Sequence, residues 1–268
     1  MIPPRYFPFA DAGFTLSVGA RPFAPEDRRI EVSAEYHREV DEKALCLAAD
    51  PQYYFQELPG TRDAQREAVT LLQQDTRGRL PRTPRFQGLA PLDAFGRCVQ
   101  EDLLLLDGEL RLVAGQLCFA NAWCLDEKLG LPLTAVHAPV PGYAEQLASP
   151  VEKLLSRLKP ERPVWRVNWG LRPVPQLDQT SRHSWWVNRM KAGCALEDCW
   201  LRVERQTLSR LELSGHVLFT IHTYQQRVSR LTASQRDLVA QVVRATPPET
   251  RRYKGIAFLA ESENAEDV

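Results

Sequence analysis

The chain lacks an excess of either charge, and it lacks any long apolar run. Its 34 lysine and arginine residues balance 34 aspartate and glutamate residues, which argues against nucleic acid or an anionic membrane as the main partner. No apolar run approaches the roughly 20 residues that a membrane-spanning helix needs. Residues 1–6 (MIPPRY) have neither the basic region nor the apolar core of a secretory signal, so we expect a cytoplasmic protein.

Several catalytic and nucleotide-binding motifs are also missing. The sequence contains neither G-x-G-x-x-G nor G-x-x-x-x-G-K-[ST], so we expect no nicotinamide or nucleotide bound through those loops. The nucleophile elbow G-x-S-x-G and the zinc motif H-E-x-x-H are absent as well. Any redox chemistry in this chain must therefore draw its electrons from a partner.

The six cysteines form no C-x-x-C pair, and their spacing fits no iron–sulfur cluster. In a chain without a secretion signal we expect them to stay reduced. Cys194 and Cys199 are separated by four residues, a spacing that suggests a metal or redox pair. Because no second pair or nearby histidine accompanies them, we favour the interpretation as ordinary small buried residues.

The pattern of apolar residues predicts an α+β fold, with an antiparallel sheet flanked by helices. Asp107-Gly108 lies between two apolar runs, which predicts a hairpin with a type I′ turn. Further strands are expected at 164–169, 200–207 and 216–224, and helices at 62–72 (with Thr61 as N-cap), 122–129 and 233–244. We expect residues 1–95 to form an arm and a helical extension, and residues 96–260 to form the main domain.

His137 is held in a stiff segment, His137-Ala-Pro-Val-Pro-Gly142. Each proline fixes its own φ and restricts the residue before it, and Gly142 permits a sharp exit. A rigid backbone beside an imidazole suits an axial metal or haem ligand, because the ring must keep its orientation. The alternative is a histidine at a helix-entry turn that bonds only to backbone.

Two strands carry alternating polar side chains. In one, Leu218, Thr220, His222 and Tyr224 share a face, which makes His222 a second candidate ligand or hydrogen-bond donor, or else an ordinary cross-strand polar residue. In the other, Arg202, Glu204 and Gln206 alternate with Leu201, Val203 and Arg205. Their ordinary interpretation is a cross-strand ion pair on a wet face.

Four blocks together resemble the haem-dependent oxidative N-demethylase family. They are 118–143, which includes HAPVPG, then WRVNW at 165–169, LRVERQTLSRL at 201–211 and VLFTIHTY at 217–224. The resemblance covers roughly residues 30–255. It departs from the family pattern at His222, where an arginine is usual, and at Ala120-Asn121-Ala122-Trp123, where P-S-x-W is usual.

This resemblance implies a PAS-like domain that binds haem b, activates O2 and demethylates a small secondary amine such as dimethylamine, releasing formaldehyde. It further implies that a separate flavin and iron–sulfur reductase supplies the electrons, with NADPH as their indirect source. The alternatives are a non-enzymatic haem-binding sensor or carrier, and a small-molecule-binding domain without haem.

If the domain binds haem, we expect the following residues at the site. His137 is the first choice for the proximal ligand, and His222 is the rival ligand or a distal donor. Arg202 or Arg205 would pair with a propionate, and Tyr224 shares the face of His222. Glu204 would lie near the cationic amine, because two charged partners strengthen a hydrogen bond.

Two further expectations concern the surroundings. The tryptophans at 165, 169, 185 and 186 are expected in the core or in the wall of a site rather than in an electron relay. The arginine-rich loop from Arg77 to Arg85 is either a solvated connector or the contact for an acidic redox partner.

Overall fold

A seven-stranded antiparallel sheet forms the centre of the computed structural model, which describes residues 1–183 and 194–260. The strand order is β1-β5-β6-β7-β3-β4-β2. The strands are β1 (Arg21–Pro22), β2 (Phe55–Glu57), β3 (Asp102–Leu106), β4 (Leu112–Gln116), β5 (Val164–Arg172), β6 (Trp200–Arg210) and β7 (Val217–Arg227). The predicted α+β class with an antiparallel sheet is confirmed. The two edge strands come from the first 95 residues, so that part of the chain belongs to the same sheet.

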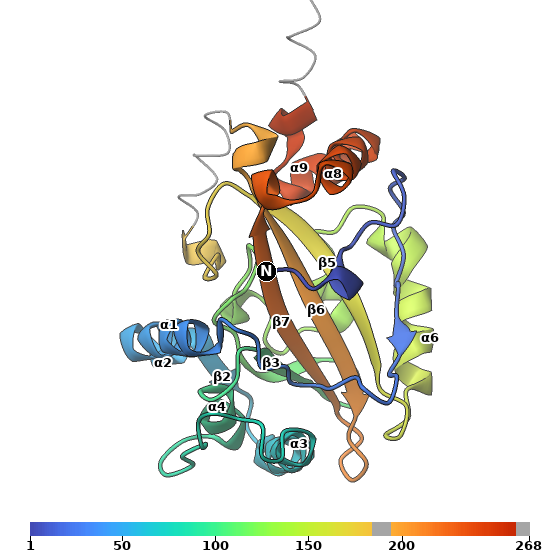
Figure 1. Cartoon of the computed structure of the whole chain (residues 1–268). Coiled ribbons are helices and arrows are strands. Elements are labelled where there is room, and N and C mark those ends of the chain that lie inside the picture. The colour runs from blue at the N-terminus through green and yellow to red at the C-terminus, as the bar shows by residue number, and fades with distance from the viewer. Residues whose placement is uncertain (184–193, 261–268) are drawn as a thin grey trace, which may run out of the picture.

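Helices surround the sheet on three sides (Figure 1). Beside β2, β3 and β4 lie α1 (Tyr36–Ala49), α2 (Pro51–Tyr54), α3 (Arg62–Asp75) and α4 (Pro91–Gly96). The long connection between β4 and β5 contains α5 (Leu133–Val136) and α6 (Ala148–Arg157). Near the end of β7 lie α8 (Ala233–Ala245) and α9 (Pro248–Lys254). The predicted helices at 62–72 and 233–244 are confirmed as α3 and α8.

The two faces of the sheet are covered by different parts of the chain. Residues 1–32 run as an arm across the front of β6 and β7 in Figure 1, and Ile2 and Ile30 of this arm are buried. We call this side the arm face. The opposite side, the loop face, is covered by residues 117–158. There the Arg210 guanidinium donates to the carbonyls of Leu155 and Leu158 at the end of α6.

The predicted hairpin is confirmed as β3 and β4, but its type I′ turn is wrong. The connection is longer than two residues, and its left-handed residue is Leu110, with φ of 59°. The Asp107 carboxylate accepts hydrogen bonds from the backbone N–H of Glu109 and of Arg111, each at 2.9 Å. Side-chain hydrogen bonds of this kind stabilise the wider turn. The preference of Asp-Gly for a two-residue turn does not anticipate them.

The predicted helix over 122–129 is also wrong. Only a single 3₁₀ turn forms, at Leu125–Glu127. Ala122 adopts φ of 66°, and its backbone N–H donates to the Gln179 carbonyl at 2.7 Å. A tertiary hydrogen bond therefore outweighs local helix propensity here.

None of the helices within the described residues has the length and hydropathy that crossing a membrane requires.

Candidate functional site

His137 ends the short helix α5 on the loop face, and both its backbone and its ring are fixed. Its Nδ1 lies 2.9 Å from the Leu133 carbonyl oxygen. A carbonyl can only accept, so Nδ1 carries the proton and Nε2 keeps its lone pair. The ring stacks on that of Tyr143, with centroids 4.7 Å apart and planes 9° from parallel. No residue within the described ranges hydrogen-bonds to Nε2.

The imidazole of His137 is held in its neutral form. Burial lowers the pKa of His137, and the nearby cations Arg166 and Lys128 lower it further, while the Leu133 carbonyl opposes them only in part. A neutral imidazole with a fixed tautomer and an available lone pair is the form that ligates a metal.

Positive charge accumulates beside this histidine. Arg166 of β5 is half-buried, and burial lowers its pKa against the opposing effect of Glu204. Lys254 at the end of α9 donates to the Trp169 carbonyl at 2.8 Å and lies 4.3 Å from the Trp169 ring centroid. Burial, then repulsion from Arg172, lowers the pKa of Lys254 to about 8. Arg172 and Arg166 both lower the pKa of Lys254, because burial removes the water that would screen their charges.

Glu204 is the acidic group that these cations share. Its Oε2 accepts from Asn168 Nδ2 at 3.3 Å and from Gln206 Nε2 at 3.1 Å. Its Oε1 lies 3.7 Å from Arg202 Nε. Arg202 also has Asp102 and Asp178 as acidic neighbours, whereas Glu204 is the one carboxylate near Arg166, Arg172 and Lys254, which leaves a surplus of positive charge in this part of the described structure. Such a surplus favours an anionic ligand.

Arg166 Nε and the Tyr143 hydroxyl oxygen are buried without a hydrogen-bond partner within the described residues. The same holds for Arg202 Nε on this face, and for His222 Nε2, Arg205 Nε and Arg205 Nη1 on the arm face. Buried polar groups in native proteins are nearly always paired, so unpaired ones require an explanation. Arg166 lowers the His137 pKa, and the Tyr143 ring stacks on the His137 ring. A ligand bound beside His137 could therefore supply partners for the unpaired atoms of Arg166 and Tyr143.

Arg202 lies beside this site but is used mainly to hold loops. It is fully buried, and its Nη1 donates to the Leu177 carbonyl at 2.8 Å. Its Nη2 donates to the Phe119 carbonyl. The expected wet face of this strand is wrong, because Arg202 and Glu204 are both buried.

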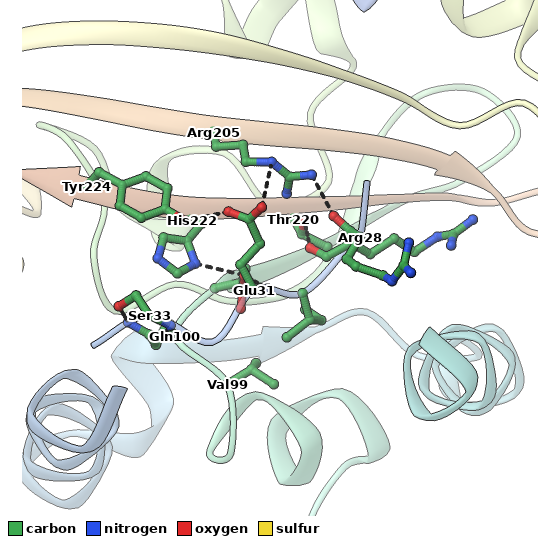
Figure 2. Close-up of polar contacts among 12 residues, drawn as sticks. Arg28, Glu31, Ser33, Val99, Gln100, Arg205, Thr220, His222 and Tyr224 are labelled. Atoms are coloured by element: carbon green, nitrogen blue, oxygen red, sulfur yellow. Dashed lines mark hydrogen bonds and ion pairs between the residues drawn. The ribbon is translucent and has the colours of Figure 1, made fainter. Parts of the chain in front are cut away.

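The other predicted residues lie on the arm face and have protein partners there (Figure 2). His222 is buried, and its Nδ1 lies 2.8 Å from Glu101 Oε1. Arg205 donates through Nη2 to the Arg28 carbonyl at 2.5 Å, and its Nε lies 3.7 Å from Glu31 Oε1. The Tyr224 hydroxyl donates to Glu31. These contacts tie the N-terminal arm to β6 and β7.

The carboxylates around His222 favour its protonated form. Burial alone would lower its pKa, but the surrounding carboxylates Glu101, Glu39 and Glu31 outweigh burial and raise it. The sheet separates His222, Arg205 and Tyr224 from His137 and Glu204, so the structure does not bring the predicted residues together in one site.

Arg166, Lys254 and Tyr143 were not among the predicted site residues. The signal for Arg166 was present in the sequence, because in WRVNW it alternates with Trp165 and Val167, which face the core. Trp165 and Trp169 lie in or against the core, as expected, whereas Trp185 and Trp186 fall outside the described residues. In the arginine-rich loop, Arg79 pairs with Asp75 and Arg82 with Asp41.

Apolar side chains adjoin the charged ones on the loop face. The Leu133 carbonyl accepts a hydrogen bond from the His137 ring, and the Leu133 side chain packs in a cluster that also contains Leu125, Leu208 and Ile221. A neutral imidazole, buried cations and apolar side chains together suit a large, partly apolar ligand that carries negative groups and a metal. The family model described as haem-dependent oxidative N-demethylase, alpha subunit-like, matches residues 75–262, well over half of the sequence. The chain belongs to this family.

Proposed function

We propose that this chain is the haem-binding catalytic subunit of an oxidative N-demethylase. It would use O2 and electrons from a separate reductase to demethylate a small amine of the dimethylamine class, with formaldehyde as a product. The observation that carries the proposal is the His137 ring, which is neutral, fixed through Nδ1 and free of a described partner at Nε2.

The loop-face residues fit haem. His137 Nε2 would ligate the iron, because the Leu133 carbonyl directs the lone pair to that nitrogen. Arg166 and Lys254 would pair with the two propionates, which would relieve the surplus charge and give Arg166 Nε a partner. The apolar cluster that includes Leu125 and Ile221 would contact the macrocycle.

When bound, haem would supply the oxidising chemistry at the N-methyl carbon, and the resulting carbinolamine would break down to formaldehyde and the demethylated amine. The contribution of the chain is to position the substrate. With propionates on Arg166 and Lys254, the Glu204 carboxylate would attract the ammonium group of an amine through Oε2, because Oε1 faces Arg202. Asn168 and Gln206 hold that carboxylate in one orientation.

Electrons would come from a flavin and iron–sulfur reductase that draws on NADPH. The alpha-subunit-like family description fits a protein that works with another subunit. We propose the loop from Arg77 to Arg85 as the contact for an acidic surface of that partner, although Arg79 and Arg82 already have acidic neighbours.

The test is formaldehyde release by the haem-loaded protein with amine, O2, NADPH and a reductase. Wild type should release formaldehyde, and Glu204→Gln should release less with a raised KM for the amine, because a neutral amide attracts an ammonium group weakly. An unchanged KM would remove Glu204 from the proposal. Haem binding without any formaldehyde release from a panel of small amines would instead indicate a haem sensor or carrier.

A further inference from the structure

Cys194 and Cys199 bring two thiols into contact at the start of β6. Their Sγ atoms are 3.7 Å apart, and both cysteines are free. Cys199 is fully buried, whereas Cys194 is half-buried and can be reached from solvent. The contact is one that the proposed demethylation does not use.

The backbone between the two cysteines holds this arrangement. The single turn Leu196–Asp198 separates them, with the Cys199 N–H bonded to the Leu196 carbonyl at 3.1 Å. The Cys199 carbonyl accepts from the Val228 N–H at 2.9 Å, which fixes Cys199 to the end of β7. A disulfide has sulfurs about 2.05 Å apart, so closing the remaining gap needs a movement of less than about 2 Å.

We propose that Cys194 and Cys199 are a redox-sensitive pair that forms an intramolecular disulfide when the protein meets a peroxide. The Cys194 sulfur attacks hydrogen peroxide and becomes a sulfenic acid, and one water leaves. Cys199 then attacks that sulfur, the S–S bond forms and a second water leaves. Two thiols lose two electrons and two protons, and one peroxide is reduced to two waters.

The assignment of roles follows from exposure and charge. Burial raises the pKa of the Cys199 thiol, and the neighbouring Cys194 raises it further, so Cys199 is a poor first nucleophile. Cys194 is the accessible member and reacts first. Peroxide is also a chemical hazard for a protein that activates O2, although the disulfide requires only the oxidant.

The bridge would act on the loop-face site. Cys199 immediately precedes β6, which carries Arg202 and Glu204, and Arg172 lies close enough to affect the Cys199 thiol. A disulfide across residues 194–199 would restrain the beginning of that strand.

The experiment uses the full-length chain, reduced with dithiothreitol, desalted and treated with a small excess of hydrogen peroxide. It is then denatured and alkylated with N-ethylmaleimide. The reduced chain should take up six maleimides, one for each cysteine. After peroxide we expect a mass lower by two hydrogens, two fewer maleimides, a linked 194–199 peptide, and full reversal by dithiothreitol.

Cys194→Ser should abolish the linked species, while the matched control Cys46→Ser, a half-buried cysteine elsewhere, should still form it. Peptide mapping of the wild type reads the link directly, so the result does not depend on whether a variant folds. Full maleimide uptake after peroxide, a link between other cysteines, or a terminal sulfinic acid on Cys194 would overturn the proposal.

Discussion

The arm face and the loop face of β6 and β7 both bury charged side chains, but they differ in how that charge is balanced. On the arm face, Arg205 lies against Glu31, which the N-terminal arm supplies. His222, whose pKa is raised, lies against Glu101. On the loop face, Arg166, Arg172 and Lys254 share the single carboxylate of Glu204. Buried polar atoms without a described partner occur on both faces, so the distinction rests on charge. Balanced buried charge indicates a structural network, and unbalanced buried charge indicates a site for a ligand.

The largest expected difference comes from the same substitution made on each face. Arg205→Met removes a fully buried cation from beside Glu31, which keeps Arg5, and leaves the Arg28 carbonyl without its donor, so it should lower the free energy of unfolding by about 1–3 kcal/mol. Arg166→Met removes a cation from an overcharged region, and should change that free energy by less than about 1 kcal/mol. Urea unfolding of the haem-free proteins measures both. Equal losses for the two variants would contradict the distinction between the faces.

Haem affinity should depend on the loop face more than on the arm face, which is the opposite of the expectation for stability. Arg166→Met removes a charged partner of a propionate, worth about 1.5–3 kcal/mol, so the dissociation constant for haem should rise roughly ten- to hundredfold. Haem titration followed by Soret absorbance measures this constant. Arg210→Met on the neighbouring strand β6, which cuts contacts to the end of α6, is the control and should leave haem affinity nearly unchanged.

The pH dependence of stability should also have opposite signs. The His222 pKa is raised when folded, so its stabilisation is complete below about pH 6.5 and is lost as pH rises through the folded pKa. The Lys254 pKa falls from 10.5 to about 8 on folding, so stability should rise with pH between those values. Each slope can reach about 1.4 kcal/mol per pH unit. Unfolding curves of wild type, His222→Gln and Lys254→Gln across pH 6–10 show which residue causes each slope of the unfolding free energy. If a slope remains after its residue is replaced, that residue is not its cause.

The smallest expected effect is at the arginine-rich loop, where Arg82 and Asp41 form an exposed pair. Arg79 pairs with the buried carboxylate of Asp75 and donates to the Ile30 carbonyl of the arm, so Arg82→Glu should alter stability only slightly and Arg79→Glu somewhat more. The reductase-coupled rate should fall a few-fold at low salt, and the difference from wild type should shrink as salt screens the charges. A rate indifferent to both salt and charge reversal would remove the loop as a docking contact.

The sequence predicted the strands that build both faces, because period-2 alternation is a local signal. It placed Glu204 and His222 on alternating positions correctly, yet it could not say which parts of the chain cover each face. That depends on the arm returning Glu31 to Arg205 and on α9 bringing Lys254 to Trp169, contacts between distant segments. The prolines after His137 suggested a rigid segment, whereas the contacts that hold its ring, the Leu133 carbonyl and the Tyr143 ring, become visible only once α5 is folded.

The most direct test of the account is the visible spectrum of His137→Ala expressed with ample haem. The variant should retain the fold by circular dichroism but lose most of its haem or show a shifted Soret band, and added imidazole should restore the wild-type band. His222→Gln, on the arm face, should keep both haem content and Soret position. An unchanged Soret band and full haem content in His137→Ala, or loss of haem in His222→Gln alone, would contradict the assignment of the ligand site to the loop face.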